Sequence, residues 1–99
     1  MILDDVASVR TGDKGDDLII AVLPRDADDY DRVRTRVTAE RVAEHYGLAE
    51  GAVHCTPMPT VTALVFHLRG VLGGGVTGSS YLDGHGKTMG YHLLTLPVE

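Results

Sequence analysis

Two apolar runs with the composition of buried β-strands constrain the fold of this chain more than any other feature. Residues 18–24 read LIIAVLP, and residues 60–70 read TVTALVFHLRG. Both are apolar on both faces, which is typical of strands inside a sheet. We expect a short strand over 2–10 to pair with 18–24 as a hairpin, the second strand ending at Pro24. Residues 52–57 predict a further brief strand.

The segment between these strands carries two helix signals. Residues 26–37 place four Asp ahead of three Arg, an order that suits the helix dipole. Thr38 can cap a second helix over 39–46, where apolar residues recur at helical spacing, and Gly47 supplies a left-handed stop. Strands outnumber helices, and the helices fall between the second and third strands. The sequence therefore predicts an α+β fold, with one antiparallel or mixed sheet and helices on one face.

The C-terminal third contains a glycine-rich stretch, VLGGGVTGSS, followed by YLDGHGKTMGYHLLTLPV. The second stretch predicts a hairpin around 83–86, with a last strand that ends near Pro97. GGGVTG matches the dinucleotide-binding glycine pattern, but that site needs a long helix after the motif, where a hairpin is expected here. We therefore predict no nucleotide and no other cofactor.

Length and charge narrow the function classes. A chain of 99 residues predicts one domain over 1–99, whose small core makes a homo-oligomer the expected state. The second apolar faces of the strands would then be buried against another copy or a partner. A formal net charge of -5 argues against nucleic-acid binding.

Compartment and metal content follow from absences in the sequence. MILDD lacks the features of a signal peptide and no apolar run is long enough for a membrane span, so a cytoplasmic location and no membrane partner are expected. The single cysteine, Cys55, cannot form an internal disulfide. No Cys/His cluster has zinc-binding spacing, so no metal site is predicted.

The segment RTGDKGDD, residues 10–17, is the first candidate site, and we expect it to be a loop between two strands. Arg10 and Lys14 are cations, and the N–H groups of Gly12 and Gly15 could form an anion-binding nest. Its acidic side chains are those of Asp13, Asp16 and Asp17. A plain polar turn is the competing interpretation, because Gly and Asp build turns through local hydrogen bonds.

The histidines are further candidates for proton transfer, because the pKa of imidazole lies near neutrality. His85, in the predicted glycine-flanked turn, is the best placed. His67 and His92 lie in apolar segments and read as structural sheet residues. His54 and Cys55 are neighbours in a predicted strand and should point to opposite faces, so a joint site is not expected.

Several of these motifs occur together in one known family. RTGDKGDD, TAERVAEHY, PTVTALVF and LGGGVTGSSYLDGHGKT resemble, in this order, the AtuA-like ferredoxin-fold domain. That domain lies at the C-terminus of acyclic terpene utilisation proteins and also occurs as a free protein of about this length. The resemblance implies a ferredoxin-like sandwich and the breakdown of branched, terpenoid or related acyl-CoA compounds. The family's marked positions fall on Arg10, Gly12, Asp13, Lys14, Gly15 and Asp16, and on Gly73, Gly74, Gly75, Asp83, Gly86 and Lys87.

The sequence departs from the family pattern at several polar positions. The family reads approximately GDKGDxxNIGV and PNLHALNF, where this chain has GDKGDDLIIAV and PTVTALVF. Ile19 and Val65 therefore replace two asparagines. Thr60, Val61 and Thr62 replace an Asn-Leu-His triplet.

Two functions of different class stay open. In the first, the chain is a small enzyme or enzyme subunit that acts on an acyl-CoA or related carboxylate, in a hydration, dehydration or lyase-type step. Arg10, Lys14 and the glycine loops would hold the anion, while Asp13, Asp16 or His85 would move the proton. In the second, it is a non-catalytic binding or assembly module for a larger AtuA-type chain, which the lost polar residues favour.

Overall fold

Four strands form one antiparallel sheet in the order β1-β2-β4-β3. The computed structural model describes residues 1–49, 51–71 and 89–98. The strands are β1 (Ala7–Lys14), β2 (Asp17–Pro24), β3 (Val53–Met58) and β4 (Ala63–Leu68). The expected hairpin of the first two strands is confirmed, since β1 pairs with β2 from Ala7↔Pro24 to Lys14↔Asp17.

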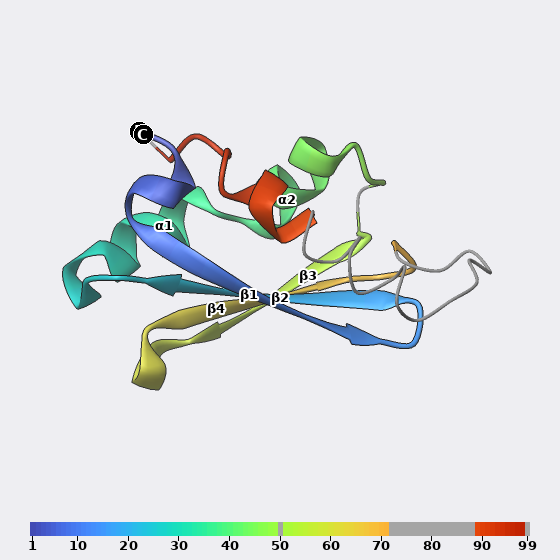
Figure 1. Ribbon diagram of the computed structural model, residues 1–99, viewed down its shortest axis with the longest axis horizontal. Coiled ribbons are helices and arrows are strands. Elements are labelled where there is room, and N and C mark those ends of the chain that lie inside the picture. Colours follow the sequence, from blue (N-terminus) through green and yellow to red (C-terminus); the bar gives the residue numbers. More distant parts are fainter. Residues whose placement is uncertain (50, 72–88, 99) are drawn as a thin grey trace.

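The helices connect β2 to β3 and lie on one face of the sheet. They are α1 (Tyr30–Arg36) and α2 (Ala39–Tyr46), and single 3-10 turns occur at Leu3–Asp5, Ala27–Asp29 and Pro59–Val61. Because β2 and β3 both run antiparallel to β4, they are parallel to each other, so β2, the helices and β3 form a split β-α-β unit. Figure 1 shows the helices on the same side of the sheet. The predicted α+β fold is confirmed.

The second helix follows the sequence signals closely. The hydroxyl of Thr38 accepts a hydrogen bond of 3.2 Å from the backbone N–H of Arg41, and Gly47 adopts the left-handed conformation at φ 69. Val42 and Ala43 are buried on its inner face. Local capping and periodicity thus determine both ends of α2.

The core lies between the sheet and the helix layer. Alternate residues of the two central strands are buried, because successive side chains of a strand point to opposite faces. The buried residues on this alternating face are Leu18, Ile20, Val22, Leu64, Phe66 and Leu68, and Ala63 at the start of β4 is buried as well. Val33 of α1 and Val42 of α2 complete this core, and both are fully buried.

The C-terminal segment corrects one expectation. Residues 89–93 are helical, where the sequence predicted a strand. A β-carbon added to Gly90 would lie 2.6 Å from Cγ2 of Thr11, so glycine allows this helix to approach β1 closely. Leu93 is fully buried against the core. Tertiary packing therefore overrides the strand propensity of the segment. The predicted turn at 83–86 lies outside the described residues.

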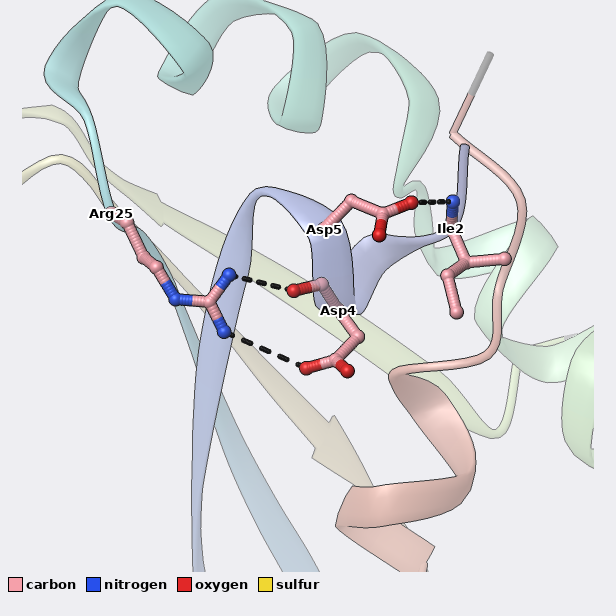
Figure 2. Close-up of polar contacts among 4 residues, drawn as sticks. All are labelled: Ile2, Asp4, Asp5 and Arg25. Carbon is pink, nitrogen blue, oxygen red and sulfur yellow. Dashed lines mark hydrogen bonds and ion pairs between the residues drawn. The ribbon is translucent and has the colours of Figure 1, made fainter.

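The N-terminal segment corrects a second expectation, since the first strand begins at Ala7 and residues before it form a 3-10 turn. The backbone N–H of Leu3 donates to the carbonyl of Leu96 at 2.8 Å. Arg25, just after β2, donates to the carbonyl oxygen of Asp4 at 2.6 Å and lies 3.5 Å from its carboxylate (Figure 2). These contacts fold the N-terminal segment back towards the helix layer. No helix among the described residues has the length and apolarity to cross a membrane.

Candidate functional site

The candidate segment 10–17 is mostly strand, and the expected loop is wrong. β1 runs to Lys14 and β2 begins at Asp17, so only Gly15 and Asp16 form the turn. Gly15 has φ 64, as the first central residue of a tight two-residue hairpin requires. Gly12 is paired with Ile19 in the ladder, so its backbone cannot contribute to an anion-binding nest. Charged side chains at an exposed sheet edge produce the same composition as a loop.

The alternation of β1 divides the predicted site residues between the two faces of the sheet. Asp13 is paired with the core residue Leu18, on the side that the helices cover. Arg10, Gly12 and Lys14 lie on the opposite side, which we call the open face because no described element covers it (Figure 1). Arg10 and Lys14 are exposed there.

A carboxylate–imidazole pair lies on this open face, and the sequence analysis did not select it as a site. Oδ2 of Asp17 is 2.6 Å from Nε2 of His67, and Oδ1 accepts a hydrogen bond of 2.7 Å from the N–H of Gly70. The hydrogen bond from His67, and then that from Gly70, holds the pKa of Asp17 below its ordinary value. The side chains are 34% and 30% exposed for His67 and Asp17, so the pair is reachable from solvent. The expectation that His67 is a hydrogen-bonded sheet residue is confirmed, with Asp17 as its partner. The same expectation for His92 is wrong, because His92 lies in the helical segment 89–93.

Two cationic residues, Lys14 and Arg69, lie near this pair. Lys14 is the cross-strand neighbour of Asp17, and Arg69 follows the end of β4 and also lowers the pKa of Asp17 by its charge. On the neighbouring strand β3, His54 is the cross-strand partner of His67. Among the described residues, Lys14 and Arg69 are therefore the cations at this end of the sheet, and Asp17 and the turn residue Asp16 are the acidic groups beside them.

The centre of the open face is apolar, and it contains two of the positions that depart from the family pattern. Ala21 pairs with Val65, and Ile19 pairs with His67, so Ile19 and Val65 are diagonal neighbours. All three apolar side chains are half-buried. Thr60 and Thr62 lie in the connection from β3 to β4, where Thr62 has the unusual φ of 48.

A separate groove runs between α2 and the outer strand β3. Two adjoining cavities of ≈ 590 and ≈ 510 Å³ share Ala39, Glu40 and Val53 as lining residues. Cys55 lines the second one, and burial raises the pKa of its thiol, which disfavours the reactive thiolate. Cys55 and His54 lie on opposite faces of β3, as expected. The described part of the chain holds no cluster of His, Cys, Asp or Glu suited to a metal ion.

The second half of the predicted site lies outside the described residues. This group comprises Gly73, Gly74, Gly75, Asp83, His85, Gly86 and Lys87. Their roles, and those of Asp13 and Asp16, stay predictions.

Comparison with family models yields a match over the whole chain. The family model for the AtuA ferredoxin-like domain matches residues 1–99, the whole chain. No curated protein and no solved structure matches significantly.

Proposed function

The chain belongs to the AtuA ferredoxin-like domain family, and on that premise we propose that its open sheet face binds an organic anion, a carboxylate or acyl thioester, and transfers a proton on it. The observation that carries the proposal is the Asp17–His67 pair, held at 2.6 Å beside exposed cations. The reaction class that fits is a hydration, dehydration or lyase-type step on an acyl-CoA or related carboxylate. Its setting would be terpenoid or branched-acyl metabolism, as the resemblance implied, and its location the cytoplasm, as expected from the sequence.

His67 supplies the proton-transfer group in this proposal. When Nε2 carries the hydrogen that Asp17 accepts, the lone pair of the neutral ring is on Nδ1, the nitrogen free to take a proton. Asp17 is itself fixed through its other oxygen by Gly70. A carboxylate that orients an imidazole and stabilises its protonated form is a recurrent arrangement in general acid–base catalysis.

Lys14 and Arg69 supply the anion-binding charge. Lys14 is exposed at the end of the β1–β2 hairpin, and no described group forms an ion pair with it. A thioester oxygen that becomes negative during proton abstraction is stabilised by such a cation. Arg10 lies two residues before Gly12 on the same strand face and extends the positive surface along β1.

The test combines ligand binding with three variants. Isothermal titration against acetate and acetyl-CoA, with amide NMR shifts as a second readout, should place binding at β1, β2 and β4. Lys14→Ala should weaken binding at least fivefold, whereas Arg34→Ala, which removes an equal charge from exposed α1, should leave it unchanged. His67→Gln should keep binding but abolish turnover of any substrate so found. Equal effects of Lys14→Ala and Arg34→Ala would rule out this site.

A second function has its own support, because an accessible apolar patch such as that of Ile19, Ala21 and Val65 is also typical of a protein–protein contact surface. Under this alternative the domain is a binding or assembly module, and a larger AtuA-type chain covers the open face. Stable co-purification with such a chain, together with loss of that complex on Val65→Asp, would favour assembly over catalysis.

A further inference from the structure

The two outer strands of the sheet differ in whether their free edge can accept another strand. The N–H of Arg69 donates to the carbonyl of Ala52 at 3.0 Å. Because the ladder alternates, His54, Thr56 and Met58 also direct their backbone groups to β4, and Pro57 faces outward. Proline has no N–H to offer at that edge, so β3 is protected against strand addition.

β1 contains no proline. The N–H of Arg25 donates to the carbonyl of Val6 at 2.9 Å, and Lys14 and Asp17 flank the two-residue turn. The even-numbered residues of β1 therefore bond to β2, while the backbone groups of Ala7, Val9, Thr11 and Asp13 point outward. Among the described residues none provides a backbone partner for these four. A hollow of ≈ 460 Å³, lined by Val9, Arg10, Thr11, Gly90 and Tyr91, leaves the middle of this edge accessible.

We propose that two copies of the chain pair antiparallel through β1, with a twofold axis at Thr11, to form a continuous eight-stranded sheet. Full overlap of the two strands would pair Ala7 with Lys14 of the other copy. It is not possible, because the backbone groups of Ala7 point to the free edge whereas those of Lys14 point to β2. Two shifted registers bring like charges together. One places Arg10 opposite Arg10 of the other copy, and the other places Arg10 opposite Lys14 of the other copy. The register centred on Thr11 avoids both, because it places Arg10 opposite Gly12 and Val9 opposite Asp13.

Gly12 supports this register. Its φ is not positive, and a β-carbon added to it would meet nothing within 4 Å, so the fold of a single copy does not require glycine there. Glycine inside a strand often marks the close approach of another chain. In the proposed dimer, the Arg10 side chain of the partner copy lies across Gly12, in the row that continues to Ile19 and His67.

The dimer therefore brings a second cation towards the proton-transfer pair. This last consequence rests on the proposed function, whereas the pairing itself does not.

Sedimentation velocity and equilibrium test the pairing directly. The parent chain should be a dimer. Asp13→Pro removes one outward N–H from each copy, so two hydrogen bonds per dimer are lost and the dissociation constant should rise about thirtyfold. Asp13→Ala is the matched control, since it removes the same carboxylate but keeps the N–H, and it should remain dimeric. Far-UV circular dichroism verifies that each variant is folded.

A crosslink tests the register independently of proline. In the proposed dimer the two Thr11 Cα atoms lie about 5.5 Å apart, within disulfide range. Thr11→Cys combined with Cys55→Ala should oxidise to a covalent dimer, whereas Ser8→Cys with Cys55→Ala should not. A monomeric parent at millimolar concentration, or an Asp13→Pro variant as dimeric as Asp13→Ala, would overturn the pairing. Crosslinking through Ser8→Cys but not Thr11→Cys would overturn the register. Ligand binding is measured separately, so failure of either proposal is visible without the other.

Discussion

The contact between Gly90 and β1 leads to a quantitative prediction. In Gly90→Ala the new β-carbon would lie 2.6 Å from Cγ2 of Thr11, about 1 Å closer than a favourable carbon–carbon contact. Overpacking of this kind costs about 1–3 kcal/mol, and the better helix propensity of alanine returns at most about 1 kcal/mol. We therefore expect Gly90→Ala to lower the free energy of unfolding by about 1 kcal/mol. For a domain of this size that corresponds to a fall in Tm of about 4–8 °C.

A double-mutant cycle isolates the cause. Thr11→Ser deletes the Cγ2 methyl group, so Gly90→Ala should be neutral or stabilising by up to about 1 kcal/mol in that background. Urea unfolding followed by circular dichroism, at one fixed protein concentration, measures all four chains. Equal losses from Gly90→Ala in both backgrounds would show that the contact with Thr11 is not responsible.

Three further predictions concern single side chains. The folded chain holds the pKa of Asp17 below its ordinary value of 3.8, so the contacts of the Asp17 carboxylate stabilise the fold above pH 3.8, and this stabilisation is lost as the pH falls through the lower pKa of the folded state. Asp17→Asn should therefore lower Tm at pH 7, and its Tm should approach that of the parent chain in strong acid. The buried hydroxyl of Tyr30 has no partner among the described residues, so Tyr30→Phe should be neutral or raise the free energy of unfolding by up to about 1 kcal/mol in urea. Thr62 has φ 48, a strained value for a β-branched residue. Thr62→Gly should therefore raise the free energy of unfolding by roughly 1 kcal/mol and raise Tm with it. A lower Tm would contradict the assignment of strain.

The second helix and the central strands were predictable because their signals are local. Thr38 and Gly47 mark the ends of α2 within a few residues of its apolar stripe. The runs that became β2 and β4 are too apolar to lie anywhere but inside the sheet. In each case neighbouring residues alone contain the information.

The end of β1 and the C-terminal helix were not predictable in this way. Arg10 to Lys14 have the composition of a loop, and only their pairing with β2 makes them a strand. The helix at 89–93 packs Leu93 into the core and Gly90 against Thr11, and these contacts lie far away in sequence.

The site shows the same limitation. Asp17 and His67 are separated by 50 positions, and they meet because the register of β2 on β4 places them at one end of the open face. A one-residue slip of either strand would send one of the two side chains to the other face. No local pattern in either segment contains that register, whereas the expectation that His54 and Cys55 diverge needed only the alternation of one strand.

The backbone bonds between the two ends of the described chain affect the order in which it folds. Leu3 and Asp4 donate to Leu96 and Leu94, and Val98 donates to Met1. During synthesis, Leu3 and Asp4 must wait until positions 94–98 have left the ribosome before their backbone partners exist. Closing so long a loop is slow, so the hairpin and the helices have time to assemble first. In hydrogen exchange, the amides of Leu3, Asp4 and Val98 should then open as one unit, at lower free energy than the central strands.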